Sequence, residues 1–266
     1  MKGGNMKKSL YDKYGPWALV TGASAGIGAA FARRLAREKF HLILVARRID
    51  KLTALKDELE KARGIQVLPV AGDLGAPGFL PGLVQAVGDR EVGLLVNNAG
   101  YGINGSFLDH DPSQEANMLA VNCRAPLLLT HHFSRPMKAR GRGGIVFLSS
   151  IGANQPTPLS STYAATKVFD LFLGEGLTYE LKPFGIDVVS VLPGVTRTEF
   201  QEVGNYRVSG HMRTAENVVN TALNALGRKS SATDGFGNKM MTFFSRRLPR
   251  SVVIRQALKV SEKWKQ

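Results

Sequence analysis

Six short apolar runs alternate with helical patterns along most of this chain of 266 residues. We expect the runs to be strands, and they cover residues 17–21, 42–46, 67–71, 93–97, 144–149 and 187–192. Strands that alternate with helices predict βαβ units and a parallel sheet. Because the runs are apolar almost throughout, they suit strands that are buried on both faces. The sequence therefore predicts an α/β fold, a single-domain doubly wound parallel sheet of the Rossmann type with helices on both faces.

The last seventy residues of the chain depart from this alternation. No linker rich in Pro or Ser divides the sequence, so we predict one domain over residues 1–266 with its core at 15–200. Residues 196–213 indicate a loop or short helices, residues 213–226 a helix, and the segment from Met240 onward is basic and amphipathic. We expect residues 196–266 to form a substrate lobe and a basic C-terminal segment.

Composition and charge limit the classes of function. A hydrophobic content of 44% and a charged content of 21% are typical of a soluble globular protein. The net charge of +14 suits a nucleic acid, a membrane surface or an anionic substrate. The basic residues are scattered and no aromatic-rich nucleic-acid motif accompanies them, so we expect no nucleic acid and leave contact with a membrane surface open.

Cysteine use and the N-terminus bear on the cellular compartment. The single cysteine, Cys123, excludes an internal disulfide and agrees with a reducing compartment. The basic N-terminus is not followed by an apolar region, and no apolar stretch approaches the length of a membrane span. We therefore expect a cytoplasmic protein without a signal peptide or transmembrane helix.

A glycine-rich turn, Thr21-Gly-Ala-Ser-Ala-Gly-Ile-Gly28, joins the first apolar run to a helical pattern over 29–39. Glycines permit a tight turn and a close approach of the backbone to a pyrophosphate, and the following helix N-terminus favours the anion. The spacing of Gly22, Gly26 and Gly28 differs from the general dinucleotide fingerprint. An ordinary strand-to-helix turn is the alternative, but three glycines at one junction favour a dinucleotide phosphate site.

Tyr163 and Lys167 lie four residues apart, which places them on the same side of a helix. A nearby cation favours the phenolate and so lowers the pKa of a tyrosine. Bringing that pKa from about 10 to near neutrality requires on the order of 4 kcal/mol. We expect the Lys167 ammonium, together with the positive charge of a bound cofactor, to supply it. A tyrosine tuned in this way can exchange protons at cellular pH.

Polar or glycine residues follow every predicted strand, and all of them reach the same edge of the sheet. They are the glycine turn, Arg47-Arg48, Asp73-Leu74, Asn97-Asn98-Ala99-Gly100, Ser149-Ser150, and the segment from Pro193 and Gly194 to Thr196. Open α/β sheets bind ligands beyond the carboxyl ends of their strands. This regularity predicts one ligand site across the edge.

Together these motifs resemble the short-chain dehydrogenase/reductase family. The resemblance rests on the glycine turn, Asn97–Gly100, Ser150, the Tyr163–Lys167 pair and Pro193-Gly194, and covers roughly residues 15 to 200. It implies a doubly wound domain that moves hydride between a nicotinamide cofactor and a carbonyl or alcohol. The Tyr-Gly-Pro-Trp sequence at 14–17 and the basic C-terminus are similar to the branch with hydroxysteroid dehydrogenases and long-chain 3-oxoacyl reductases.

The resemblance also implies roles for single residues. Tyr163 would be the acid/base, Lys167 would depress its pKa and hold the nicotinamide ribose, and Ser150 would donate a hydrogen bond to the reacting oxygen. Asn122 would be the fourth catalytic residue. Asp73 would lie near the adenine amino group, and Asn97 would brace the central strands. The implied cofactor site is Thr21, Gly22, Ser24, Gly26, Ile27, Gly28, Arg47, Arg48, Asp73, Leu74, Asn98, Ala99, Gly100, Tyr163, Lys167, Pro193, Gly194 and Thr196, without a metal.

A proline four residues after Asn122 adds a physical reason for interest in that position. In a helix the carbonyl of residue 122 accepts from the amide of residue 126, but Pro126 has no N–H. We expect a free Asn122 carbonyl and a kink, with a water bridging toward Lys167 as a proton route. A kink without catalytic meaning is the alternative.

The residues after the second strand bear on the choice of cofactor. NAD sites usually carry an acid there to bond the ribose 2′-hydroxyl, whereas NADP sites carry arginine. Arg47 and Arg48 occupy this position without an acid, and Ser24 could add a hydroxyl. An arginine fork suits a phosphate, so we predict NADP(H).

The resulting hypothesis is an NADP(H)-dependent oxidoreductase that acts on a ketone or secondary alcohol with a lipid-like or otherwise apolar substrate. Phe200, and Met240 or Phe243, would line such a site. A reductase of small polar carbonyls or sugars is one alternative, and a non-catalytic NADP-binding sensor or scaffold is another. A sensor would be expected to lose Tyr163, Lys167 or Ser150, and the chain keeps all three.

The Tyr163 helix also predicts an assembly. Its side away from Tyr163 carries only uncharged residues, namely Ala165, Val168, Phe169, Phe172, Gly176 and Tyr179. A helix that is apolar away from its own site is usually buried there too. We predict a homodimer or homotetramer through this helix, with the Asn122 helix beside it. Cover by the chain's own C-terminal segment is the alternative.

Overall fold

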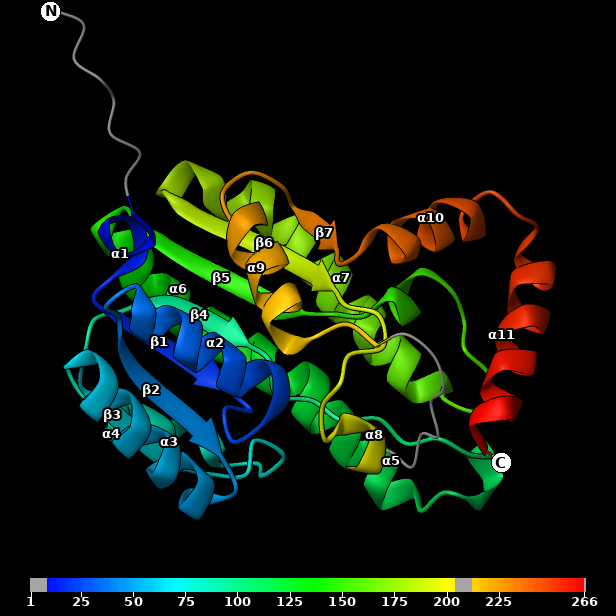
Figure 1. The fold of residues 1–266 in the computed structure, drawn as a ribbon, viewed down its shortest axis with the longest axis horizontal. Coiled ribbons are helices and arrows are strands. Elements are labelled where there is room, and N and C mark those ends of the chain that lie inside the picture. Colours follow the sequence, from blue (N-terminus) through cyan, green and yellow to red (C-terminus); the bar gives the residue numbers. More distant parts are fainter. Residues whose placement is uncertain (1–8, 204–211, 266) are drawn as a thin grey trace, which may run out of the picture.

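The computed structural model describes residues 9–203 and 212–265, which form one parallel sheet between two layers of helices (Figure 1). The strand order is β3-β2-β1-β4-β5-β6-β7. The strands are β1 (Trp17–Thr21), β2 (His41–Ala46), β3 (Val67–Ala71), β4 (Val92–Asn97), β5 (Gly143–Leu148), β6 (Ile186–Leu192) and β7 (Ser231–Thr233). The predicted doubly wound fold is confirmed, and the ends of the six predicted strands are correct to within one residue. Strand β7 was missed, because three residues make no recognisable apolar run.

Alternate residues of the strands pack into two separate cores, one on each face of the sheet. In β1, Ala18 and Val20 pack on one face, and Trp17 and Leu19 pack on the other. The first core is covered by α2 (Gly26–Arg37), α3 (Ile49–Arg63) and α9 (Ala215–Ala225). The second is covered by α4 (Phe79–Val87), α6 (Ala125–Arg140) and α7 (Ser161–Leu181). Burial on both faces explains why the strands are apolar throughout.

A π-helical turn, Ala120–Arg124, joins α5 (Pro112–Leu119) to α6. The Ala125 N–H donates to the Ala120 carbonyl, five residues earlier, instead of to a carbonyl four residues earlier. Such bulges often lie at functional sites. The turn contains Asn122, so the backbone irregularity expected before Pro126 is present at that residue.

Three further helices stand beyond the carboxyl ends of the strands, on the right of Figure 1. They are α8 (Phe200–Val203), α10 (Phe236–Ser245) and α11 (Arg250–Lys265). Short 3₁₀ turns lie at Phe107–Asp109, Ile151–Asn154 and Lys182–Phe184. Part of the predicted 196–213 loop lies outside the described residues. Within the described chain, no helix has the length and apolar character needed to cross a membrane.

The opposite end of the sheet is closed by α1 (Leu10–Tyr14). The Tyr14 hydroxyl donates to a carboxylate oxygen of Asp187 at 2.7 Å, which fixes the N-terminal segment to the start of β6. Burial and this carboxylate raise the pKa of Tyr14, so its hydroxyl keeps the proton that it donates. The Tyr-Gly-Pro-Trp segment therefore supports the fold and lies far from the site at the other edge.

Candidate active site

One cavity of about 1170 Å³ runs along the carboxyl edge of the sheet and out to α10 and α11. At one end it is lined by the glycine turn and by Arg47 and Arg48. Tyr163 lies on its wall, and the far end is lined by Met241, Phe244, Leu248, Val253, Ala257 and Val260. The cavity thus joins a polar, glycine-rich end to an apolar end, with the candidate acid/base between them.

The glycine turn is packed too tightly to accept side chains at its glycine positions. Gly22 has a φ of +66°, and a Cβ there would lie 2.8 Å from the Asn98 amide nitrogen. Gly26 has a φ of +54°, and its Cβ would lie 2.9 Å from Thr198. Both φ values belong to the left-handed region that favours glycine. The backbone therefore stays open at the N-terminus of α2, as binding of a pyrophosphate requires.

Three of the predicted site residues lie behind the cavity wall, namely Thr21, Gly28 and Asn122. The Thr21 hydroxyl donates to the Val96 carbonyl at 3.2 Å and accepts from the Asn98 and Ala99 N–H groups at 3.0 Å. Gly28 packs against the carbonyl of Gly22. Thr21 and Gly28 hold in place the turn that lines the cavity. The other predicted site residues all line it.

The prediction that Asn97 braces the central strands needs correction. Its amide nitrogen donates to the Thr130 hydroxyl at 2.9 Å, so it ties β4 to α6. Asn98 braces the strands instead, because its amide nitrogen donates to the Thr21 carbonyl at 2.8 Å. The physical reason is side-chain alternation, since Asn97 still belongs to the strand and faces a helix, whereas Asn98 follows the strand end.

Tyr163, Ser150 and Lys167 come together on the cavity wall. The Tyr163 ring packs against Phe200 with 5.5 Å between ring centroids, and the Lys167 ammonium lies 5.9 Å from the Tyr163 ring centroid. Burial raises the pKa of Tyr163, although Lys167 and a hydrogen bond from Ser150 act to lower it. The predicted fall of this pKa toward neutrality included the positive charge of a bound cofactor, so it stays a prediction; Lys167 by itself does not offset burial.

Lys167 owes its position to two acceptors. Its ammonium donates to the Leu148 carbonyl at 2.7 Å and to a carboxylate oxygen of Asp170 at 2.9 Å. Burial alone would lower the pKa of Lys167, but Asp170 and Tyr163 reverse the direction and raise it. Lys167 is thus a buried, charged group beside Tyr163, the candidate acid/base. Asp170 was not predicted, since an acid three residues after Lys167 belongs to no motif recognised in the sequence.

Asn122 holds the loop after β4 beside Lys167. Its side-chain oxygen accepts from the Tyr101 N–H at 3.1 Å, and its amide nitrogen donates to the Tyr101 carbonyl at 2.8 Å and to Thr166 at 3.0 Å. A Cβ on Gly100 would lie 3.2 Å from the Asn122 oxygen and 3.3 Å from the Lys167 ammonium. The Asn122 side chain is therefore a clamp between this loop and α7. The water relay from its carbonyl stays a prediction.

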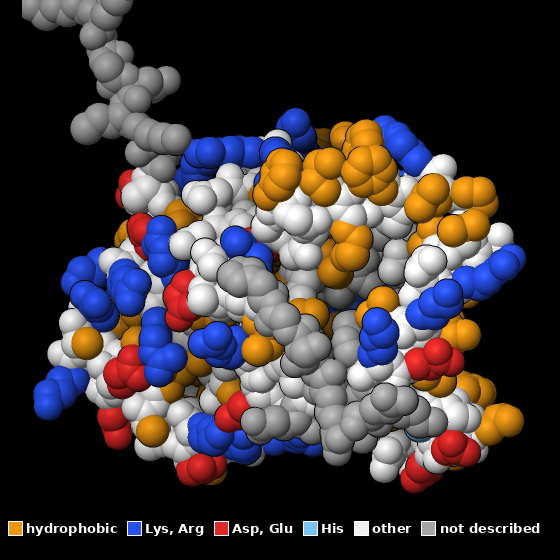
Figure 2. All heavy atoms as spheres, turned by 45° about the vertical axis from the view of Figure 1, so that its right-hand side comes forward, with side chains coloured by type: hydrophobic (Ala, Val, Ile, Leu, Met, Phe, Trp, Pro, Cys, Tyr) orange, Lys and Arg blue, Asp and Glu red, His pale blue; other side chains and the backbone are white. Residues whose placement is uncertain are grey.

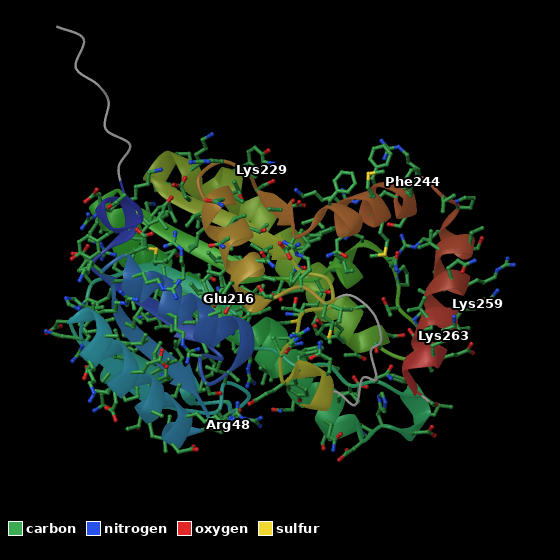
Figure 3. The ribbon with its side chains drawn as sticks, viewed as in Figure 1. Arg48, Glu216, Lys229, Phe244, Lys259 and Lys263 are labelled. Atoms are coloured by element: carbon green, nitrogen blue, oxygen red, sulfur yellow. The ribbon has the colours of Figure 1, made fainter. Side chains whose placement is uncertain are left out.

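Arg48 meets an acid that comes from a distant part of the chain. Its guanidinium donates to the Ser24 hydroxyl at 3.0 Å and to Glu199 at 2.8 Å, and Lys51 also donates to Glu199 at 2.8 Å. Figure 3 shows Arg48 on the side of the sheet where α3 begins. These two cations hold the pKa of Glu199 below its usual range. Glu199 was missed because it lies 151 residues from Arg48 along the chain.

The apolar lining differs in detail from the prediction. Phe200 lines the cavity, but Met241 and Phe244 do so in place of Met240 and Phe243. The amphipathic pattern identified the helix, and only its rotation was misjudged. Within the described ranges, no group of three or more His, Cys, Asp or Glu side chains could hold a metal ion.

Comparison with known proteins shows which enzymes this chain resembles. The family model described as short chain dehydrogenase matches residues 16–207. A very-long-chain 3-oxoacyl-CoA reductase from Podospora anserina is 33% identical over 250 residues, which cover 92% of this chain and 72% of that protein.

Two solved structures share the fold over most of their length. A 7β-hydroxysteroid dehydrogenase superposes with a TM-score of 0.87 at 27% identity, covering 94% of this chain and 99% of the other. A short-chain dehydrogenase from Sphingobium yanoikuyae in complex with NADPH gives a TM-score of 0.78 at 32% identity, covering 87% and 93%. The predicted family is thereby confirmed: the chain belongs to the short-chain dehydrogenases and is an oxidoreductase that uses a nicotinamide cofactor.

Proposed function

We propose that this protein is an NADP(H)-dependent reductase of ketones carried on bulky, apolar molecules. The observation that carries the proposal is the continuous cavity, which joins the Arg47 and Arg48 end, Tyr163 and the apolar end between α10 and α11. The long-chain and steroid substrates in the names of the Podospora and 7β-hydroxysteroid enzymes support the same class.

The glycine turn and the two arginines would hold the cofactor, which supplies or accepts the hydride when bound. The turn leaves room for a pyrophosphate, and Arg47, Arg48 and Ser24 together offer charged and hydroxyl donors for a 2′-phosphate. The NADPH bound to the Sphingobium relative supports this choice.

Tyr163 would give its proton to the carbonyl oxygen of the substrate as that oxygen gains charge. A phenol with a pKa near or above about 10 is protonated at neutral pH and can therefore act as a proton donor. Ser150 would donate a hydrogen bond to the same oxygen, and such a donor contributes a few kcal/mol to the transition state. The charge of Lys167 would stabilise the phenolate that remains.

Turnover of a panel of ketones, measured by the oxidation of NADPH, tests the proposal. The panel pairs bulky apolar ketones, a ketosteroid and a long-chain 3-oxoacyl thioester, with small polar keto sugars. We expect kcat/KM to be at least about tenfold higher for the apolar members, because a few buried CH₂ groups contribute roughly 0.8 kcal/mol each.

A variant at the apolar end sharpens the test. Phe244→Asp places a charge on the cavity wall and should lower kcat/KM for the bulky ketones while leaving NADPH binding unchanged. Phe243→Asp is the matched control, since this neighbour does not line the cavity. Preference for keto sugars would favour the small-carbonyl alternative. NADPH binding without turnover of any ketone would favour the sensor alternative.

A further inference from the structure

Helix α10 carries large apolar side chains on the face turned away from the cavity. Met240 and Phe243 lie three residues apart on this helix, are 38% and 47% exposed and do not line the cavity. We call these two residues the α10 stripe. Phe236, Met241 and Phe244 line the cavity from the same helix. Helix α10 is therefore apolar both toward the cavity and toward solvent. Figure 2 shows hydrophobic side chains gathered along the upper edge of the molecule, where α10 lies.

Basic residues precede and follow the α10 stripe along the chain and continue through α11. Residues 236–263 contain seven Lys or Arg and one acid, Glu262, which gives 7 − 1 = +6. The seven, all exposed, are Lys239, Arg246, Arg247, Arg250, Arg255, Lys259 and Lys263. Arg247 stands one turn after Phe243, with its guanidinium 3.4 Å from the ring centroid. Lys259 and Lys263 extend the basic zone along α11 (Figure 3).

This combination of side chains is that of a helix pair which lies on an anionic membrane surface. Aromatic residues enter the boundary between head groups and acyl chains, while Lys and Arg meet anionic lipid head groups. The described parts of the chain do not cover the stripe. A second copy docked through the same face would bring two surfaces of +6 together, which repel each other. We infer that α10 and α11 dock on the surface of an anionic lipid bilayer.

Docking of this kind has a consequence for the cavity. Its apolar end is lined by residues of α10 and α11, the same helices that would contact lipid. A molecule docked in this way holds the apolar end next to the acyl chains. An apolar ligand could then enter from the bilayer without crossing water.

Co-sedimentation with lipid vesicles tests the inference, with no cofactor or substrate present, so its outcome does not depend on the proposed activity. We expect the protein to sediment with vesicles of phosphatidylcholine and phosphatidylglycerol at low ionic strength, and much less with phosphatidylcholine alone. Each basic residue at an anionic surface strengthens binding roughly fivefold. The double variant Arg250→Glu, Arg255→Glu should therefore weaken binding at least about tenfold.

Matched variants distinguish docking through α10 and α11 from a nonspecific electrostatic attraction between the basic protein and the anionic vesicles. Met240→Ser with Phe243→Ser should weaken binding to the same vesicles while leaving turnover of a soluble ketone unchanged, since neither residue lines the cavity. Phe184→Ser, an exposed aromatic outside the stripe, and Lys61→Glu with Arg63→Glu on α3 are the controls.

Three results would overturn the inference. One is absence of wild-type binding to the anionic vesicles. Another is an equal loss of binding in the α3 charge variant. The third is a smaller oligomer for Met240→Ser with Phe243→Ser in size-exclusion chromatography, which would make the stripe an interface between copies of the chain.

Discussion

The Lys167 ammonium lies 2.9 Å from a carboxylate oxygen of Asp170, one turn further along α7, and both side chains are buried. Burial raises the pKa of Asp170 to about 6, although Lys167 opposes this. The carboxylate that anchors Lys167 therefore titrates close to physiological pH. When Asp170 takes up a proton, the ammonium loses the negative charge that it faces.

We expect kcat to fall as the pH drops through about 6, because protonation of Asp170 releases Lys167. Asp170→Asn should lack this acid limb and turn over on the order of tenfold more slowly, since hydrogen bonds to charged groups contribute about 1.5–3 kcal/mol. The pH profile of kcat measures both effects. Glu175→Gln, on the same helix, is the control, because Glu175 contacts Ser231 and not Lys167. If kcat of Asp170→Asn still falls below about pH 6 as in the wild type, a group other than Asp170 is responsible for that fall.

Tyr163→Phe removes only the phenol oxygen. We expect the fold and cofactor binding to survive, and kcat to fall by roughly a hundredfold or more, the usual contribution of a general acid. Lys167→Ala should lose turnover and part of its cofactor affinity as well. Steady-state kinetics together with a cofactor titration separate the two variants. Near-normal turnover by Tyr163→Phe would show that another group donates the proton.

The Arg48 and Glu199 ion pair predicts how cofactor choice can be shifted. NADPH should bind on the order of tenfold to a hundredfold more tightly than NADH, because charge-assisted hydrogen bonds contribute roughly 1.5–3 kcal/mol. Glu199→Gln should increase this preference, since Arg48 would no longer be shared with a carboxylate. Arg47→Ala and Arg48→Ala should decrease it.

Fluorescence titration with both cofactors measures the preference. Glu58→Gln is the matched control, because Glu58 forms an exposed ion pair with Arg33, away from the cavity. A preference that rises equally in this control would reflect net charge instead of the Arg48 contact. Equal or tighter binding of NADH by the wild type would contradict the NADP(H) proposal.

The sequence was sufficient for six of the seven strands and for the residues at the carboxyl edge of the sheet, because both follow from short-range patterns. Strands buried on both faces are continuous apolar runs, and parallel strands deliver their ends to one edge. The turn at Gly22 and the Tyr163–Lys167 pair are local motifs of the same kind. Their spacing alone determines which side chains meet.

Short-range sequence patterns could not predict contacts between residues far apart in the chain, or how far a side chain is buried. Glu199 meets Arg48 only because the loop after β6 folds back over the start of α3. Sequence spacing shows that a cation lies near Tyr163, but it does not show that burial opposes the effect of this cation on the pKa of the phenol. Met241 and Phe244 were mistaken for their neighbours, since one residue of rotation moves a side chain from solvent to the cavity.

The exposed side of α7 bears on the last prediction, the assembly. Phe172 is 66% exposed and Tyr179 is 75% exposed, so neither is covered by the described part of the C-terminal segment. Leu119 and Leu127, which flank the π-helical turn, are also exposed, at 46% and 43%. Apolar groups of this size in the open mark an interaction surface. We therefore predict a homodimer or homotetramer through α7, with α5 and α6 beside it.

Phe172→Glu should dissociate this assembly, because it would place two like charges across a shared helix face. Static light scattering at micromolar concentration measures the mass of the wild type and of the variant. Leu108→Glu, at a 90% exposed position outside these helices, is the control and should keep the wild-type mass. A monomeric wild type would refute the assembly. An oligomer that withstands Phe172→Glu would place the interface on another face.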